Sequence, residues 1–303
     1  MKTQKINQFL YLIDLEPAGL ENFIASYVLV GEKIAIIETG PTSTVTNLLR
    51  GLKEIGVNTE DVDFVAISHV HLDHGGGAGT LMQSLPKAKL IVHPRGAPHL
   101  VNPEKLWTQS RQVLGKVAEM YGEPEPVSSE RIIQAFDGMP VSLGKNIELE
   151  ILETLGHASH HLSYDEKGSK MLFPGDAAGI YLSQFDVLVP TTPPPFHLET
   201  ALLSINKLIQ KEPSLLCYTH FGVAKNSIEK LNRHSAQLRL WADIVANGLK
   251  KGETLETISE DIQQKDPAVK DVSQYVKTHP VLSGGVARQD VRGFIEYIIN
   301  QSK

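Results

Sequence analysis

Short apolar segments recur along the chain between polar and glycine-containing stretches, a pattern that predicts β-strands. They are rich in Val, Ile, Leu and Phe and span residues 27–30, 34–37, 64–67, 90–92, 147–152, 171–173 and 215–218. The first two are separated by the short turn Gly31-Glu32-Lys33. We therefore expect these two segments to pair as a β-hairpin.

Between these strands, apolar residues recur at the spacing of one helix face. One set, at positions 45, 48, 49 and 52, lies between Pro41 and Gly56, which are start and stop signals. A second helix is predicted to begin at Asn102-Pro103-Glu104 and to contain Leu106, Leu114, Val117 and Met120. A third is predicted from Leu198, Ala201, Leu202, Ile205 and Leu208. Strands that alternate with helices indicate the α/β fold class.

The last quarter of the chain has a different, mostly helical pattern. A long amphipathic helix is predicted from residue 227 to residue 249, and Leu255, Ile258 and Ile262 predict a shorter one. We expect residues 1–225 to form the main domain and residues 226–303 to form a helical extension packed on it. The simplest role of this extension is to cover a sheet face, and a pocket lid or an oligomer contact is the alternative.

Composition and charge narrow the functional classes. The 303 residues are 41% hydrophobic, which suffices for a proper core. The net charge of -6, without a dense basic block, favours a small-molecule substrate over nucleic acid or a membrane surface. One cysteine, Cys217, excludes an intramolecular disulfide, and the apolar stretch at 9–13 is too short for a signal core. We expect a cytoplasmic protein without a membrane partner, and a homo-oligomer is an open alternative.

The segment His69-Val70-His71-Leu72-Asp73-His74 is the most informative part of the sequence. Four of its side chains carry the nitrogen or oxygen donors that hold zinc, iron or manganese. It directly follows the predicted strand at 64–67 and is closed by Gly75-Gly76-Gly77, which permit a sharp turn. A solvated polar turn would not require this arrangement, so we interpret the segment as part of a metal site.

Three more places have a histidine or an aspartate beside glycine after an apolar run. They are Gly156-His157, Gly175-Asp176 and His220-Phe221-Gly222. A catalytic metal takes three protein ligands, and a two-metal hydrolytic site needs about twice that number, often with one bridging carboxylate. Together with the first segment, these donors form a set of the size that two metals require.

This set resembles the motifs of the metallo-β-lactamase superfamily of metal-dependent hydrolases, which occur here in order between about Tyr27 and Gly222. The resemblance implies an αββα four-layer sandwich with the site along one edge between two sheets. By position, it implies a first metal bound by His69, His71 and His157, a second bound by Asp73, His74 and His220, and a bridging Asp176. The implied cofactor is two divalent metal ions, with zinc favoured and iron or manganese as alternatives.

The implied chemistry is hydrolysis by a hydroxide shared between two cations, and Asp73 is placed to orient that hydroxide as well as to ligate. One position departs from the family pattern, because Glu38 in Ile-Glu-Thr-Gly stands where aspartate is usual. We expect Glu38 to lie behind the ligands and to tie the histidine-rich loop. Asp176 counts against a dedicated β-lactamase, since those enzymes generally have serine or cysteine there.

The leading interpretation of the reaction is the glyoxalase-II-like group, which hydrolyses thioesters, lactones or related esters. A phosphodiesterase or a promiscuous β-lactamase of the same fold is the nearest alternative, because a bridging hydroxide serves phosphorus equally well. A mononuclear iron persulfide dioxygenase shares most of the ligands. A metal-binding regulatory protein without turnover is the alternative outside the enzymes.

The other histidines are expected to lie outside the ligand set. His161 is expected to support the ligands or to pack in a strand. The remaining ones lack a ligand context, and of these only His197 is expected to reach the pocket: His93, His99, His197, His234 and His279. The segment 182–196 is interpreted as either a pocket wall or a surface loop.

Overall fold

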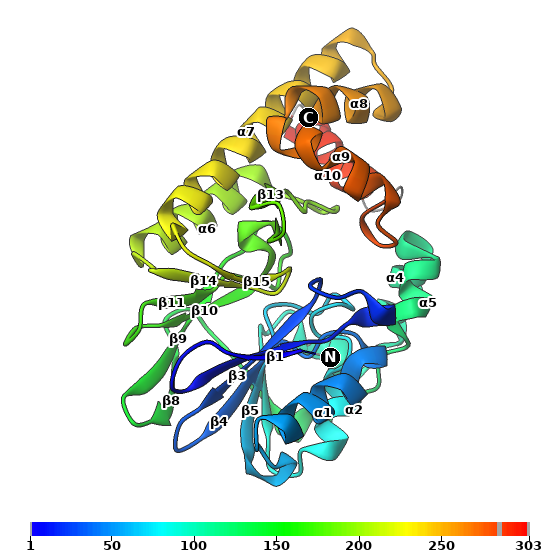
Figure 1. Ribbon diagram of the computed structural model, residues 1–303. Coiled ribbons are helices and arrows are strands. Elements are labelled where there is room, and N and C mark those ends of the chain that lie inside the picture. Colours follow the sequence, from blue (N-terminus) through cyan, green and yellow to red (C-terminus); the bar gives the residue numbers. More distant parts are fainter. Residues whose placement is uncertain (1, 284–286, 302–303) are drawn as a thin grey trace.

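The computed structural model describes residues 2–283 and 287–301, so residues 284–286, 302 and 303 of the predicted extension lie outside the described residues. Two β-sheets lie face to face, and helices cover both outer faces (Figure 1). This is the predicted αββα sandwich with additional C-terminal helices, and the α/β fold class is confirmed.

The first sheet has the strand order β1-β2-β3-β4-β5-β6-β7. Its strands are β1 (Thr3–Lys5), β2 (Leu10–Asp14), β3 (Ala25–Val30), β4 (Ile34–Ile37), β5 (Val62–Ala66), β6 (Lys89–Val92) and β7 (Ile132–Gln134). Strands β1 to β4 pair antiparallel, which confirms the predicted hairpin between β3 and β4. Strands β4 to β7 pair parallel, so their carboxyl ends meet at one edge.

The second sheet has the strand order β15-β14-β11-β10-β9-β8. Its strands are β8 (Pro140–Gly144), β9 (Ile147–Glu153), β10 (Leu162–Glu166), β11 (Met171–Phe173), β14 (Leu215–Tyr218) and β15 (Gly222–Ala224). Only β11 and β14 pair parallel among these neighbours. A separate hairpin consists of β12 (Ile180–Leu182) and β13 (Val187–Val189).

The space between the sheets is filled by apolar side chains from both. Along β9, Ile147, Leu149 and Ile151 are buried, whereas the alternate positions Glu148 and Glu150 lie outside this core. This period of two is what a strand with one buried face requires. Full burial of each aliphatic side chain contributes about 1.5–3 kcal/mol, so this core fixes the register of the strands that carry the site.

Helices form the two outer layers. On the first sheet lie α1 (Val45–Glu54) and α2 (Ala78–Ser84). Gly51 lets α1 approach β2, because a Cβ atom there would lie 2.5 Å from Cγ2 of Ile13. On the second sheet lie α6 (Leu198–Gln210) and α7 (Ser227–Lys251), which also contact each other.

The region after β6 contains the short helices α3 (Ala97–Val101), α4 (Glu104–Leu114) and α5 (Lys116–Tyr121). The sequence predicted one continuous helix across α4 and α5, and this prediction was wrong. Gly115 adopts φ 54° and ψ -121°, which lies outside the helical region and separates the two. The helix begins at Glu104, one residue after the predicted first helical residue Pro103, and the side chain of Asn102 accepts a hydrogen bond from the backbone of Glu104 (3.3 Å).

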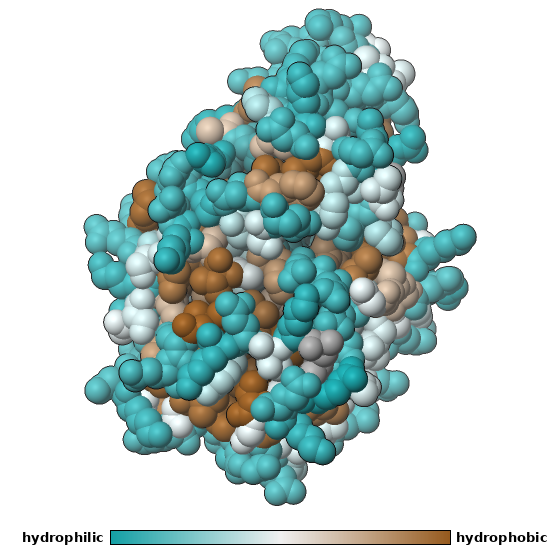
Figure 2. Space-filling model, viewed as in Figure 1, coloured by the Kyte–Doolittle hydropathy of each residue, from teal (hydrophilic) through white to brown (hydrophobic). Residues whose placement is uncertain are grey.

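The chain ends in α8 (Leu255–Lys265), α9 (Pro267–Thr278) and α10 (Ala287–Gln301), which gather at the far end of α7 (Figure 1). Asp266 caps α9 and also accepts a hydrogen bond from Nε1 of Trp241 in α7 (2.7 Å), which ties these helices together. Figure 2 shows that their outer surface is mainly hydrophilic. Within residues 2–283 and 287–301, no helix is long and apolar enough to cross a membrane.

Candidate metal centre

The histidine-rich loop leaves β5 and turns back on itself, with the backbone N–H groups of His74 and Gly75 both donating to the carbonyl of His71 (3.0 and 2.9 Å). The three glycines that follow do not adopt positive φ angles, so the predicted sharp turn does not explain why glycine occupies these positions. A Cβ atom on Gly75 would lie 2.8 Å from the Ile67 side chain, and one on Gly76 would lie 2.3 Å from the Leu72 carbonyl. The glycines allow the loop to pack closely on itself.

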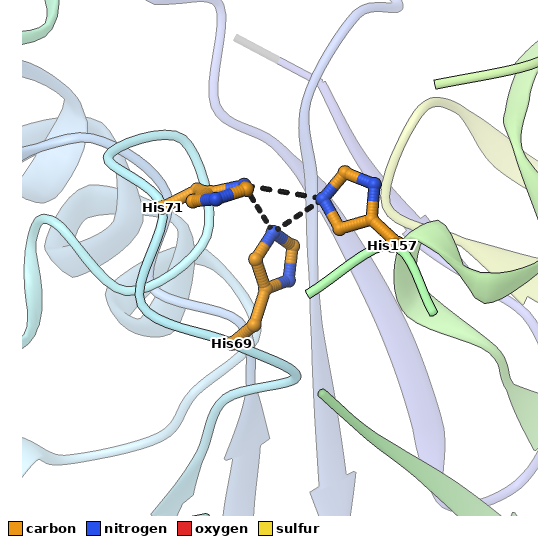
Figure 3. A group of neighbouring side chains, drawn as sticks. All are labelled: His69, His71 and His157. Carbon is orange, nitrogen blue, oxygen red and sulfur yellow. Dashed lines mark hydrogen bonds between the residues drawn. The ribbon is translucent and has the colours of Figure 1, made fainter. Parts of the chain in front are cut away.

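A first group of donors consists of His69, His71 and His157, whose rings point toward one another (Figure 3). Nε2 of His69 lies 2.9 Å from Nδ1 of His71, and Nε2 of His157 lies 3.2 and 3.1 Å from these two atoms. An imidazole nitrogen either carries one hydrogen or accepts one, so neutral rings cannot make all three contacts hydrogen bonds. One cation facing three lone pairs satisfies them all.

The rings of His157 and His220 are each held by a hydrogen bond on the side that faces away from the donor cluster. Nδ1 of His157 donates to the carbonyl of Thr191 (2.9 Å), and Nδ1 of His220 donates to the carbonyl of Phe23 (3.0 Å). Because a carbonyl only accepts, the proton is on Nδ1, and Nε2 presents its lone pair to the site. Burial lowers the pKa of His157, and burial together with the neighbouring His157 lowers the pKa of His71 to about 3. Both rings are therefore in the neutral form that binds metals.

A second group consists of Asp73, His74 and His220, with ligand atoms within 4.8 Å of one another. Oδ2 of Asp73 lies 3.5 Å from Nε2 of His220. Burial would raise the pKa of Asp73, but the neighbouring rings of His220 and His74 outweigh it and lower the pKa to about 2. Asp73 is thus an ionised carboxylate beside two imidazoles.

Asp176 lies between the two groups. Its Oδ1 is 3.3 Å from Nε2 of His74, and its Oδ2 is 3.5 Å from Nε2 of His157. Oδ1 and Nε2 of His74 are both buried, and neither has a hydrogen-bond partner among the described residues. Tetrahedral zinc with bonds of about 2.05 Å separates its ligand atoms by roughly 3.3 Å. The separations and the unpaired atoms fit a bound cation.

The charge of the cluster also suits a cation. Burial would raise the pKa of Asp176, but His74 and His157 hold it well below its usual range. Burial would lower the pKa of His74, but Asp176 and Glu38 raise it well above its usual value. A positive charge between these carboxyl groups is therefore stabilised, whether a proton or a metal supplies it.

Two buried residues hold the ligands from behind. The carboxyl group of Glu38 lies 3.3 Å from the backbone nitrogen of Ser68 and 3.2 Å from Nδ1 of His74. Nε2 of His161 accepts from the backbone N–H of Asp176 (3.0 Å), and its Nδ1 contacts the hydroxyl of Thr154 (2.9 Å). The longer side chain of Glu38 still reaches the histidine-rich loop, and His161 positions Asp176.

A cavity of about 480 Å³ opens above the cluster. His71, Asp73, His157, Asp176 and His220 lie at its floor. Its walls come from α4 and α5, from Thr191 and Pro193 to Pro195, and from the segment around α9 and α10 at Val281, Leu282, Gln289 and Asp290. The stretch 182–196 therefore contributes to the pocket wall, and the C-terminal helices line the cavity besides covering other helices.

His197 does not reach this cavity, which corrects the sequence interpretation. Its ring accepts a hydrogen bond from the backbone of Thr200 and caps α6. His99 and His160 line the cavity instead. Burial lowers the pKa of His160 to about 4, and its buried Nδ1 has no hydrogen-bond partner in the part of the chain that the structure describes. No sequence pattern indicated that His99 lines the cavity, because the direction of its side chain depends on α3, which was not predicted.

Asp290 in α10 is a second residue that the sequence did not reveal. Its Oδ1 accepts from the backbone N–H of Thr192 (2.6 Å), and the Thr192 hydroxyl donates to the Asp290 carbonyl (2.9 Å). The adjacent Thr191 carbonyl orients His157, so α10 is tied to the loop that positions a metal ligand. Burial raises the pKa of Asp290 to about 8. A single aspartate in an amphipathic helix carries no recognisable motif.

Several known proteins resemble this chain in sequence and in fold. The chain is 26% identical over 243 residues to the metallo-beta-lactamase fold-containing protein ST1585 of Sulfurisphaera tokodaii, covering 78% of this chain and 87% of that protein. The crystal structure of ST1585 matches with a TM-score of 0.66 over 76% of this chain and 86% of that one. A probable metallo-hydrolase of Methanocaldococcus jannaschii, MJ0888, is 26% identical over 156 residues, covering 52% of this chain and 68% of that protein.

The metallo-beta-lactamase family protein TTHA1429 of Thermus thermophilus matches with a TM-score of 0.71 over 98% of this chain and 95% of that one. Its 20% sequence identity shows the shared fold alone. The family profile of the metallo-beta-lactamase superfamily matches residues 20–220, a stretch that holds all seven clustered donors. The protein therefore belongs to the metallo-beta-lactamase superfamily, whose members are mostly metal-dependent hydrolases.

Proposed function

We propose that this protein is a dinuclear metal-dependent hydrolase that acts on an ester-type small molecule, a thioester or a lactone of the kind cleaved by glyoxalase-II-like enzymes. The position of Asp176 carries this proposal. Its two carboxylate oxygens face His74 of one donor group and His157 of the other. A carboxylate shared between two groups suits a pair of cations, whereas a structural site is closed and needs no such bridge.

In this proposal His69, His71 and His157 would hold one ion, Asp73, His74 and His220 would hold the other, and Asp176 would be available to both. Zinc is the proposed metal, with iron or manganese as alternatives that the same ligand types accept. Two bound divalent cations supply an activated water nucleophile near neutral pH and electrophilic stabilisation of the developing oxyanion.

The protein groups around the ions orient the reactants. Asp73 lines the cavity, with a side chain 24% exposed, and its low pKa keeps it ionised. It can accept a hydrogen bond from the attacking water and so aim it at the substrate. The Tyr121 hydroxyl and Nδ1 of His160 lack partners within the described residues, and both side chains line the cavity.

A nucleophilic side chain is not needed for this reaction. Cys217 is 1% exposed and lies in the core between the sheets, and burial raises the pKa of its thiol. The thiol is therefore protonated and away from the cavity, as expected for a buried strand residue. Water is the nucleophile that the arrangement of donors supports.

Elemental analysis and a substrate panel on the same preparation test this proposal. We expect two divalent ions per chain and turnover of a thioester or a lactone, both lost after chelation and restored by added zinc. The panel includes a β-lactam and a phosphodiester as competing substrates. About one iron per chain with persulfide oxidation would overturn the proposal. Full metal content without turnover of any ester would also overturn it and would favour a regulatory metal-binding protein.

A further inference from the structure

The walls of the cavity above the donor cluster carry no lysine or arginine among the described residues, although the chain has 29 of these residues. The carboxyl groups that line the cavity are those of Asp73 and Asp176 in the donor cluster and Asp290 in the wall. Two divalent cations held by the donor cluster would neutralise Asp73 and Asp176, so the floor alone would not discriminate between a carbonyl and a phosphoryl oxygen. A carboxylate on the part of the substrate that lies between the walls would find no lysine or arginine as a partner. Charge complementarity therefore favours an uncharged group between the walls.

The walls of the cavity are mainly apolar. One wall presents Leu106, Val113, Leu114 and Val117 from α4 and α5. The opposite wall presents Pro193, Pro194, Pro195, Val281 and Leu282. A volume of about 480 Å³ lies within the range of small-molecule pockets. An aliphatic chain that enters between these walls would be buried from water on both of its sides.

The polar groups of the cavity that lie outside the donor cluster are mostly uncharged. Tyr121 is 1% exposed, and its hydroxyl has no hydrogen-bond partner among residues 2–283 and 287–301. The amides of Gln109, Gln112 and Gln289 also line the cavity. Such groups hydrogen-bond a carbonyl oxygen but do not compensate the charge of a carboxylate between the walls.

We propose that the cavity binds a neutral aliphatic acyl group between its walls, so that this protein hydrolyses acyl thioesters or lactones and discriminates against carboxylate-bearing acyl groups. This inference rests on the proposed hydrolase function and specifies its substrate class. In the reaction, the water oxygen bonds to the carbonyl carbon and the carbon–sulfur or ring carbon–oxygen bond breaks. The leaving thiol or hydroxyl takes up a proton from the water, and the acid is released.

N-acetylcysteamine thioesters of butanoate, hexanoate, octanoate and decanoate test the inference, because their leaving group is neutral. We expect kcat/KM to rise about fourfold per added methylene until the cavity is filled, as burial of about 0.8 kcal/mol per methylene requires. The thioester of octanedioate, with its free carboxylate, is expected to fall about 100-fold below octanoate. Equal turnover across the chain lengths, or of octanedioate and octanoate, would overturn the inference while leaving the hydrolase proposal intact.

Binding to the metal-free protein provides a readout that does not depend on activity. Calorimetry with decanamide is expected to show binding with a negative heat-capacity change, whereas butanamide and decanoate bind far more weakly. If no thioester or lactone is hydrolysed, the proposed function fails, and decanamide binding still decides the inference about the cavity. Absence of decanamide binding would overturn it.

A matched pair of variants locates the specificity. Val113 is 48% exposed and lines the cavity, whereas Leu203 is 68% exposed on α6 and does not line it. Val113→Arg adds a cation to the wall and is expected to raise the ratio of octanedioate to octanoate turnover at least about tenfold. Leu203→Arg adds the same charge elsewhere and is expected to leave the ratio unchanged. An equal effect of both variants would overturn the assignment of this wall.

Discussion

The donor cluster and the cavity above it are built in opposite ways. The cluster consists of polar side chains in loops that follow strand ends, and the rings of His74, His157 and His220 are each fixed by a contact from behind. The cavity wall consists of apolar side chains from α4 and α5, residues 193–195 and residues 281–282, which are far apart in the sequence. In the proposed function, short local motifs would supply the metal ligands, whereas segments that are far apart in the sequence would select the substrate. Variants of one region should therefore leave the property of the other region unchanged.

The largest effect is expected from Asp176→Ala. Loss of the carboxylate that faces both donor groups should reduce kcat by about 1000-fold or more, because neither group then shares a ligand with the other. The thermal unfolding midpoint should stay within a few degrees, which is measured by circular dichroism. Asp243→Ala, at an exposed position on α7, is the matched control. Unchanged turnover of the thioester by Asp176→Ala would contradict the proposed bridging role.

His157 and His160 lie three residues apart but belong to different regions. His157→Ala removes one nitrogen of the three-histidine group and is expected to lose about one metal ion per chain. His160→Ala changes only a cavity residue and is expected to keep the metal, with kcat/KM lowered about tenfold. Elemental analysis after gel filtration measures both. If His160→Ala lost more metal than His157→Ala, the metal ligand in this motif would be His160, three residues after the position assigned here.

The donor residues could be singled out from the sequence because they lie in short loops that follow apolar segments. The packing of the core fixes the ends of the strands. The pattern of buried residues therefore determines where residues just beyond these ends, such as His69 and His220, lie. Glu38 could be interpreted for the same reason, since it follows β4. Local periodicity is sufficient wherever the functional residue is adjacent to a well-packed strand.

The cavity could not be predicted in this way. The apolar spacing continues from Leu114 to Val117, so periodicity does not reveal the break at Gly115, which depends on one pair of backbone angles. Both His197 and His99 lack a ligand context in the sequence, and only the packing of α6 and α3 determines which of the two side chains faces the cavity. Long-range packing, rather than local propensity, sets these directions.

Asp290 connects the two regions, and its variants test how strongly they are coupled. Asp290→Ala leaves the Thr192 N–H without its acceptor, which costs about 1–3 kcal/mol, and loosens the loop that orients His157. We expect metal affinity to fall about tenfold, measured by competition with a chelator. Asp290→Asn keeps an acceptor oxygen and should retain the affinity. Equal loss in both variants would show that the carboxyl group itself, rather than the hydrogen bond, is required.

The same aspartate predicts a pH dependence of stability. Burial raises its pKa to about 8 in the folded protein, whereas the unfolded chain ionises near 3.8. Its contribution is fully present below about pH 4, is lost as the pH rises toward 8 and does not change above that. The stability of the metal-free protein relative to Asp290→Asn should therefore fall between pH 5 and pH 8, by up to about 1.4 kcal/mol per pH unit. Urea unfolding measures this, and a constant difference would contradict it.

Variants of Glu38 are expected to have the smallest effect on the protein. They distinguish the contribution of the side-chain length from that of the carboxyl group. Glu38→Asp keeps the carboxyl group that the Ser68 backbone and His74 contact and should lower metal affinity less than tenfold. Glu38→Gln keeps the length, but both carboxyl oxygens lie 3.3 Å from the Ser68 nitrogen, so its amide would place a donor against a donor. We expect the larger loss in Glu38→Gln. Neither variant should change the preferred acyl length, because Glu38 does not line the cavity, and a shifted preference would show that the cluster also helps to select the substrate.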